Sequence, residues 1–317
     1  MNLLVTGGCG FIGSNFIKWV LEKKQSLISK VVNVDVLTYA GDIQNTQSFA
    51  PNKKYFFEKV DLCDSKKLLE VFVKHSITHV VHLAAESHVD NSILNPSKFI
   101  ESNIVGTFNL LKISYDYKVI KFHHVSTDEV YGDLGTVGKF SEKTPYNPHN
   151  PYSASKASSD FLVKSYFHTY KLPITISNCS NNYGPHQHKE KFIPTIIYSL
   201  LDKKNIPLYG KGLNVRDWIY VTDHCAGIWE VFMKGNLGET YCIGSNCEKR
   251  NIDVIKSICN IMKKKPEDWI EHVTDRLGHD FRYAIDNTKI KTTLNWNPQY
   301  SFEEGIKQTI EWYNERY

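Results

Sequence analysis

Long apolar runs and a one-sided charge are both missing from this 317-residue sequence. No uninterrupted apolar stretch approaches the ~18 residues that a membrane-spanning helix needs, so we expect no membrane partner. The 38 basic and 34 acidic side chains leave a formal net charge of +4, and no basic block extends beyond Lys263 to Lys265. Nucleic-acid binding leaves a clustered basic footprint, so we expect no nucleic-acid partner either.

Paired cysteines, internal repeats and low-complexity tracts are also absent from the sequence. The seven cysteines are odd in number and lack the close spacings of a metal site, so we expect reduced thiols, no metal and a cytoplasmic location. Hydrophobic residues make up 41% of the chain and charged residues 23%, which is ordinary for a folded globular protein. A chain of this length can bury one large core or two linked ones.

The N-terminal segment places a strand, a glycine turn and a helix in the order of a dinucleotide-binding motif. Glycines stand at Gly7, Gly10 and Gly13 after a short apolar run, and residues 14–23 have helical apolar spacing. These glycines allow a tight turn, close approach of a pyrophosphate and close packing of helix on strand. A second apolar run ends in Asp35, whose carboxylate can accept from ribose hydroxyls and would repel a 2′-phosphate. We therefore predict NAD rather than NADP.

Strand and helix patterns alternate through the first half of the chain. Apolar strand patterns recur at 31–35, 55–60, 79–83, 119–126 and 174–177, with helical patterns between most of them. Such alternation builds a parallel sheet. From about residue 179 the elements become shorter and prolines and glycines punctuate them. We predict an α/β fold, a Rossmann-type doubly wound parallel sheet with a smaller mixed α/β substrate-binding lid.

Two short segments carry side chains suited to proton transfer. Tyr152 and Lys156 are four residues apart on a predicted helix, so the ammonium can lower the phenol pKa from about 10 toward neutrality. Asp128 and Glu129 are adjacent carboxyls at a strand end, where one can give a proton and the other can take one. Each pair alone is more often a surface feature. Because both follow a nucleotide-binding motif, we favour the catalytic interpretation.

Arginines in the second half point to a phosphate-bearing substrate. Arg216 precedes a strand pattern, and Arg276 and Arg282 lie in a charged segment. A surface ion pair is the simple explanation for each of them. A guanidinium also binds phosphate oxygens through two parallel hydrogen bonds, which is what a diphosphate in the lid would need. We therefore favour a diphosphate-bearing substrate.

Several motifs together resemble the dTDP-glucose 4,6-dehydratases, a group of sugar nucleotide 4,6-dehydratases within the extended short-chain dehydrogenase/reductase family. The glycine turn and the Tyr-x-x-x-Lys motif indicate only the larger family, whereas Thr-Asp-Glu ahead of that Tyr indicates the dehydratases. The resemblance spans essentially the whole chain. The segments that carry it are Thr6–Gly13, Leu83–Asp90, Ser126–Gly132, Tyr152–Lys156, Asn178–Pro185, Arg216–Trp218 and Asp275–Asp280.

This resemblance implies a lyase that converts dTDP-glucose to dTDP-4-keto-6-deoxyglucose with bound NAD. Tyr152 would remove the C4 hydroxyl proton, with Thr127 holding that hydroxyl and Lys156 tuning Tyr152 and gripping the nicotinamide ribose. Glu129 would then take the C5 proton while Asp128 protonates the departing C6 hydroxyl. The hydride removed at C4 would return at C6, so no net redox change occurs.

The resemblance also assigns binding roles. The NAD site would be formed by Gly7, Gly10, Phe11, Ile12, Gly13, Asp35, Leu37, Thr38, Asp61, Leu62, Leu83, Ala84, Ala85, Ser102, Tyr152, Lys156 and Asn182. The sugar nucleotide would meet Ser87, Thr127, Asn181, Lys191, Arg216, Asn251, Arg276 and His279. Asn251 has a simple alternative role as the cap of a following helix.

Family membership further implies a division of the chain and an assembly. We expect an NAD-binding domain over 1–178 that also takes in about 215–240, and a mainly sugar-nucleotide-binding domain over 179–317. Relatives pair through two helices each, which here are 97–117 and 152–170, so we expect a homodimer. A UDP-glucose 4,6-dehydratase and a sugar nucleotide epimerase remain alternatives, although Asp128 and Glu129 argue against the epimerase. An NAD-binding scaffold without activity is the alternative from outside the enzymes.

Overall fold

The structure is a computed structural model that describes residues 1–275 and 280–317. Its central sheet consists of β1 (Asn2–Thr6), β2 (Lys30–Asp35), β3 (Tyr55–Lys59), β4 (His79–His82), β5 (Lys121–Thr127), β6 (Ile174–Cys179) and β10 (Thr240–Ile243). All neighbours in this sheet pair in parallel, in the order β3-β2-β1-β4-β5-β6-β10. The first six strands thus have the order of a doubly wound nucleotide-binding sheet, with β10 added at one edge.

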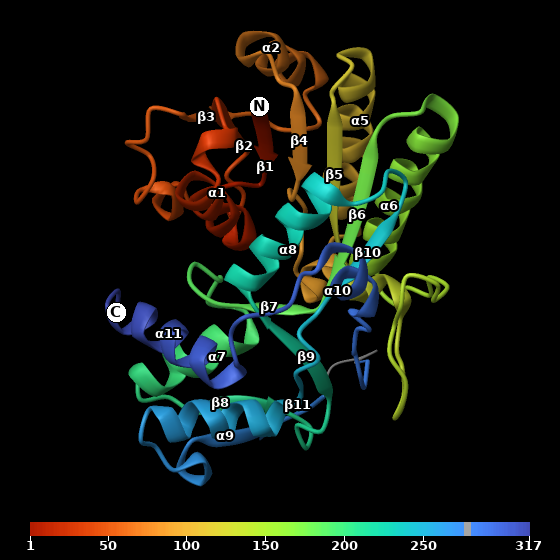
Figure 1. The fold of residues 1–317 in the computed structure, drawn as a ribbon. Coiled ribbons are helices and arrows are strands. Elements are labelled where there is room, and N and C mark those ends of the chain that lie inside the picture. The colour runs from red at the N-terminus through yellow and green to blue at the C-terminus, as the bar shows by residue number, and fades with distance from the viewer. Residues whose placement is uncertain (276–279) are drawn as a thin grey trace.

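The helices among the described residues are α1 (Phe11–Lys23), α2 (Ser65–His75), α3 (Val89–Leu94), α4 (Pro96–Phe99), α5 (Gly106–Asp116), α6 (Pro151–Tyr170), α7 (Phe192–Leu201), α8 (Val221–Lys234), α9 (Asn251–Ile261), α10 (Thr288–Leu294) and α11 (Phe302–Asn314). They cover both faces of the central sheet and surround the smaller sheets below it (Figure 1).

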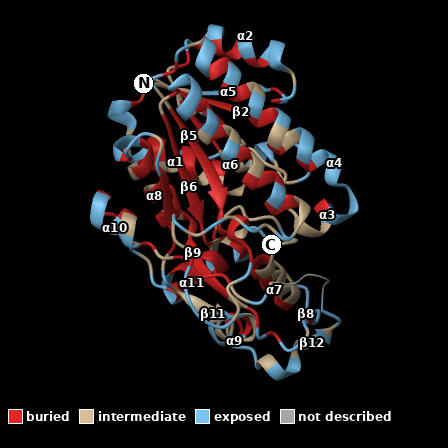
Figure 2. Ribbon diagram, turned by 90° about the vertical axis from the view of Figure 1, so that its right-hand side faces the viewer, coloured by how far each residue is buried: buried red, intermediate tan, exposed pale blue. Residues whose placement is uncertain are grey.

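Each face of the central sheet has its own apolar core. Side chains alternate along a strand, so Leu3 packs with α1 and α8 on one face while Leu4 packs with α2, α5 and α6 on the other. Both leucines are fully buried. Figure 2 shows the buried strands running through the middle of the molecule between helices with exposed outer faces. The predicted Rossmann-type parallel sheet is confirmed.

The second part of the chain builds the predicted mixed lid. It contains a three-stranded sheet of β7 (Asn181–Tyr183), β9 (Val215–Tyr220) and β11 (Glu248–Arg250), and a parallel pair of β8 (Ile206–Tyr209) and β12 (Ile270–Val273). A third apolar cluster joins these strands to α7, α9 and α11. Among the described residues, no helix combines the length and the apolar character required to cross a membrane.

One predicted element differs from the structure. The pattern after Asn95 predicts a continuous helix to about Tyr117, whereas residues 100–105 form a wider π-helical segment between α4 and α5. The side chain of Asn103 in this segment bonds both the N–H and the C=O of Glu86. This contact connects the segment to the loop that follows β4.

Candidate active site

The glycine turn has the geometry that a dinucleotide needs. Gly7 has a φ of +70°, and a Cβ there would lie 2.8 Å from the Ala84 Cα. A Cβ on Gly13 would collide with the Gly7 carbonyl oxygen. The turn leads directly into α1, whose first turn contains no acidic residue. The free N–H groups and the positive dipole end of this helix are therefore available to an anion such as a pyrophosphate.

Asp35 ends β2 beside this turn. Its Oδ2 accepts a hydrogen bond from the Cys9 N–H at 2.9 Å, and its Oδ1 accepts one from the Leu37 N–H at 2.8 Å. Burial raises the Asp35 pKa, and these two backbone donors oppose the rise. Both oxygens keep a lone pair for a further donor. The carboxylate is thus fixed in place with the capacity to accept from two ribose hydroxyls.

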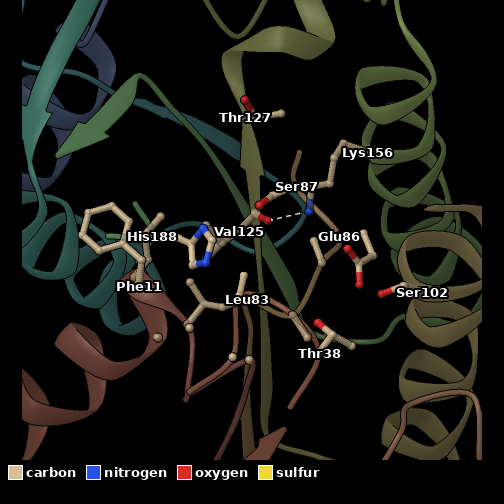
Figure 3. A pocket seen from close by; sticks show the side chains of 18 of the residues that line it. Phe11, Thr38, Leu83, Glu86, Ser87, Ser102, Val125, Thr127, Lys156 and His188 are labelled. Atoms are coloured by element: carbon tan, nitrogen blue, oxygen red, sulfur yellow. Dashed lines mark hydrogen bonds between the residues drawn. The ribbon is translucent and has the colours of Figure 1, made fainter. Parts of the chain in front are cut away.

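A first cavity of about 310 Å³ opens at the carboxyl ends of the central strands. Its walls include Phe11 from the glycine turn, Leu83 after β4 and Lys156 from α6 (Figure 3). Leu37 does not line it, and instead supports Asp35 through its backbone. The residues predicted for the NAD site that line this cavity are Gly7, Gly10, Phe11, Ile12, Gly13, Asp35, Thr38, Asp61, Leu62, Leu83, Ala84, Ala85, Ser102, Tyr152, Lys156 and Asn182.

A second cavity of about 320 Å³ lies toward the lid. Arg216 and Asn251 line it, and Glu129, Asn181 and Lys191 line both cavities. The two cavities therefore adjoin. Two other predicted substrate residues, Ser87 and Thr127, line the first cavity. The predicted substrate residues Arg276 and His279 lie outside the described residues.

The Arg216 guanidinium is held in place at the wall of the second cavity. It donates to the carbonyl oxygens of Val215 and Asp280 at 2.8 and 2.9 Å. It also lies 4.3 Å from the centre of the Tyr283 ring. A fixed guanidinium is suited to binding an anionic group such as a diphosphate, because little freedom remains to be lost on binding.

Asp128 follows β5 in the wall of the first cavity and is almost completely buried. Burial, followed by the charges of Glu129 and Asp217, raises its pKa well above the usual range, whereas Arg216 lowers it. The Thr127 hydroxyl lies 3.4 Å from the Asp128 Oδ1 and accepts from the Glu129 N–H. A carboxyl whose burial favours its protonated form, beside a second carboxyl, matches the acid and base pair predicted from the sequence.

Tyr152 and Lys156 stand at the start of α6, both buried and both lining the first cavity. We predicted from the sequence that Lys156 lowers the Tyr152 pKa, and this prediction is wrong for the protein without a bound cofactor. Burial, followed by the charges of Glu129 and Cys179, raises the Tyr152 pKa well above its usual value. The Lys156 ammonium donates to the Val125 carbonyl at 2.9 Å instead (Figure 3).

Two residues near the site, Asp160 and Tyr283, were not predicted from the sequence. Asp160 is fully buried on α6, one turn beyond Lys156, and its four-residue spacing was a signal that could have identified it. Tyr283 lines the second cavity and stacks on Arg216. No local pattern connects Tyr283 with Arg216, which lies 67 positions earlier in the chain.

Comparisons with known proteins agree with this geometry. The family model described as GDP-mannose 4,6 dehydratase matches residues 4–309. The chain is 48% identical to a dTDP-glucose 4,6-dehydratase of Neisseria meningitidis serogroup B, over 98% of this chain and 92% of that protein.

Two solved structures also resemble this chain over nearly its whole length. A dTDP-glucose 4,6-dehydratase of Streptomyces venezuelae with NAD and TYD bound is 42% identical with a TM-score of 0.96, covering 99% of this chain and 97% of that one. The NAD complex of the Bacillus anthracis dTDP-glucose 4,6-dehydratase is 44% identical with a TM-score of 0.92, at the same coverage of both chains.

Proposed function

We propose that this chain, which belongs to the dTDP-glucose 4,6-dehydratase family, removes water from dTDP-glucose to form dTDP-4-keto-6-deoxyglucose with bound NAD. The observation that carries the proposal is the junction of the two cavities. Glu129, at the end of β5, lines both cavities, while Asp128, Tyr152 and Lys156 line the first. An acid, a base and a phenol around one hexose are what elimination after oxidation requires.

The residues of the first cavity fit NAD. Gly7 and Gly13 leave room for the pyrophosphate where a Cβ would meet backbone, and Asp35 offers its carboxylate to the ribose. Lys156 would reach the nicotinamide ribose with its ammonium. When bound, NAD supplies a cationic ring that takes a hydride at C4 and returns it at C6.

The side chains of this protein carry the proton steps in the proposal. Tyr152 takes the C4 hydroxyl proton, and Thr127 holds that hydroxyl. Oxidation at C4 makes the C5 proton acidic, so Glu129 removes it. Asp128 gives its proton to the C6 hydroxyl, which leaves as water. The raised Asp128 pKa supports its role as the acid, because burial favours the protonated form of this carboxyl.

The sugar nucleotide would occupy the second cavity, with its hexose at the junction. Arg216 would bind the diphosphate, while Ser87, Asn181, Lys191 and Asn251 would contact the rest of the substrate. Arg276 and His279 remain predicted substrate residues. In this arrangement the NAD-binding part is 1–178 with about 215–240, and 179–317 mainly binds the sugar nucleotide. The packing of α8 against α1 in one core supports placing that helix with the first part.

A homodimer is part of the same proposal. Exposed apolar side chains stand on the two helical stretches that family resemblance assigns to pairing. Ile100 is 52% exposed, Phe108 43% and Phe161 59%. Covering such side chains would stabilise a pair of chains.

Turnover of two nucleotide sugars tests the proposed activity. Purified protein supplied with NAD should convert dTDP-glucose to a product lighter by one water, measured by mass spectrometry. It should convert UDP-glucose at least about tenfold less efficiently, a difference of about 1.4 kcal/mol in transition-state binding. Preference for UDP-glucose would reassign the nucleotide, and C4 epimerisation without water loss would indicate an epimerase. NAD binding without turnover of either sugar would favour a scaffold.

A further inference from the structure

A buried carboxylate lies behind the catalytic side chains. Asp160 is fully buried on α6, one helical turn beyond Lys156 and two turns beyond Tyr152. Its Oδ2 accepts hydrogen bonds from the Ser126 hydroxyl at 2.9 Å and the Tyr146 hydroxyl at 2.8 Å. Neither cavity includes Asp160 in its walls. Any influence of this carboxylate on the reaction must therefore pass through its neighbours.

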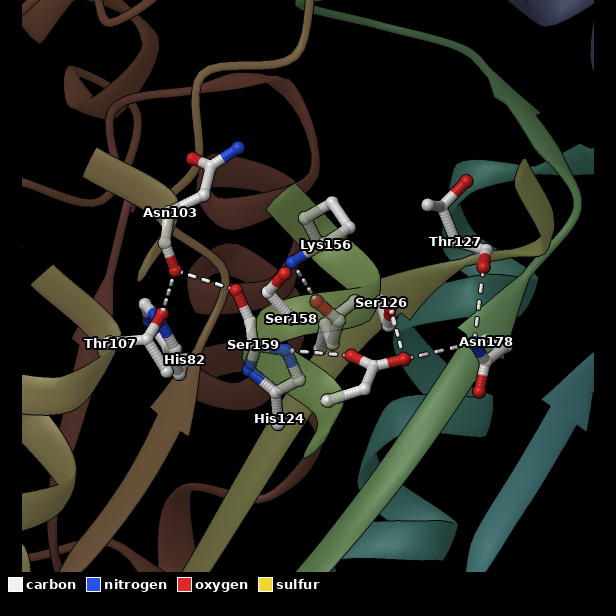
Figure 4. A network of polar contacts seen from close by, with 12 residues as sticks. His82, Asn103, Thr107, His124, Ser126, Thr127, Lys156, Ser158, Ser159 and Asn178 are labelled. Carbon is white, nitrogen blue, oxygen red and sulfur yellow. Dashed lines mark hydrogen bonds and ion pairs between the residues drawn. The ribbon is translucent and has the colours of Figure 1, made fainter. Parts of the chain in front are cut away.

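Two further groups complete the surroundings of this carboxylate. The His124 Nε2 lies 3.1 Å from the Asp160 Oδ1, and the Asn178 side-chain nitrogen lies 3.5 Å from the Oδ2 (Figure 4). Burial raises the Asp160 pKa, but His124, Lys156 and Tyr146 lower it, and the balance leaves it below the usual range. Because a buried charge persists only with such partners, we take Asp160 to be an anion in the folded chain.

Lys156 is the cation whose pKa the Asp160 carboxylate raises. Its side chain is almost completely buried, and burial lowers its pKa, whereas Asp160 and Cys179 raise it. The imidazoles of His82 and His124, whose centres are 5.2 Å apart, also face this region. Neutral rings supply no charge to offset the burial of an ammonium. Asp160 is thus the carboxylate that opposes the effect of burial on the Lys156 pKa.

The same carboxylate supports the end of β5. Ser126, which donates to Asp160, directly precedes Thr127. Asn178 donates to the Thr127 carbonyl at 3.1 Å and also approaches Asp160 (Figure 4). The backbone that presents Thr127 and Asp128 is therefore held from behind by the carboxylate that lies one helical turn beyond Lys156 on α6.

We propose that Asp160 is a positioning residue, whose carboxylate keeps the Lys156 ammonium charged at the cofactor site and fixes the strand end that carries Thr127. The role given to Lys156 rests on the proposed function. A carboxylate whose only role was to hold Ser126, Tyr146 and His124 would leave the protonation of Lys156 unchanged when its charge is removed. The proposal requires that protonation to depend on the charge of Asp160.

The test compares wild type with Asp160→Asn, which keeps the size and an acceptor oxygen but removes the charge. The first measurement is the rate at which NAD dissociates from the purified holoprotein between about pH 7 and pH 9. Asp160→Asn should release NAD about tenfold faster at the upper pH than at the lower, because Lys156 loses its proton there. Wild type should change by less than about twofold over that range.

Steady-state kinetics give the second measurement. The kcat of Asp160→Asn should fall by roughly tenfold with little change in KM for the sugar nucleotide, and its alkaline limb should begin about one pH unit below that of wild type. Tyr146→Phe is the matched control, since it removes one hydrogen bond to the same carboxylate without removing charge. It should keep the wild-type pH dependence of NAD release.

Identical pH dependence in wild type and Asp160→Asn would overturn the proposal, whatever the loss of thermal stability. If Asp160→Asn does not fold, wild type alone can still overturn the proposal. Its NAD release should stay flat to about pH 8.5, and a tenfold rise below that pH would show that Lys156 is not kept charged. NAD release requires no turnover, so a wild type that binds NAD but dehydrates no sugar nucleotide would contradict the proposed function alone.

Discussion

At the scale of single residues, each catalytic side chain acts in a different step, so its replacement should stop the reaction at a different point. Tyr152→Phe should give no ketone at C4, because the phenol that takes the hydroxyl proton is gone. Glu129→Gln should form the 4-keto nucleotide sugar and retain the C6 hydroxyl. Asp128→Asn should lower kcat by about 10² or more, since an amide cannot donate the proton. Acid quenching followed by mass spectrometry distinguishes these products. Loss of ketone formation in the Glu129→Gln variant would refute the division of roles.

The sequence predicted which residues meet at the site better than it predicted their ionisation. Adjacent carboxyls and a four-residue spacing are local patterns, so Asp128, Glu129, Tyr152 and Lys156 were identified from the sequence. The Tyr152 pKa depends instead on burial and on the charge of Glu129, both of which arise from the fold. Leu37 was assigned to the cofactor site, yet it supports Asp35 through its N–H and does not line the cavity.

At the scale of elements, the two helical stretches that we propose to pair in a homodimer provide a test that is independent of catalysis. Phe161 stands on α6 with 59% of its surface exposed. Phe161→Glu would place a charge in an apolar interface, and each unpaired buried charge costs several kcal/mol or more, so this variant should sediment as a monomer at concentrations where wild type is a dimer. Leu69→Glu, at a 44% exposed position on α2, is the matched control and should remain dimeric. A monomeric wild type, or a dimeric Phe161→Glu, would rule out this interface.

The strands and the break in one helix show what sequence patterns can and cannot predict at this scale. The buried strand β2 reads as a largely apolar run, so its position follows from local composition. The π-helical segment at 100–105 was missed because Asn103 within it bonds Glu86, which belongs to a different loop. The charged segment beginning at Asp275 was predicted to bind the substrate, and Arg276 and His279 fall outside the described residues.

At the scale of the whole molecule, buried histidines predict the response to acid. His224 is fully buried, and burial lowers its pKa from 6.5 to about 3. Between these values only the unfolded chain takes up its proton, so the free energy of unfolding falls as pH falls. This histidine contributes about 1.4 kcal/mol per pH unit over that window.

Replacing His224 isolates this contribution from that of every other group. Neither ring nitrogen has a hydrogen-bond partner among the described residues, so His224→Leu removes no such bond. Urea unfolding between about pH 5.5 and pH 4 should give this variant a slope shallower than wild type by about 1.4 kcal/mol per pH unit. Equal slopes would show that His224 is protonated in the folded chain.

The most direct test of the central claim follows a label through one turnover. If the hydride removed at C4 returns to C6 of the same sugar, dTDP-glucose carrying deuterium at C4 should yield a 4-keto-6-deoxy product with that deuterium at C6. Nuclear magnetic resonance of the isolated product locates the label. We expect deuterium at C6, whereas loss of the label to solvent or its retention at C4 would rule out the proposed reaction.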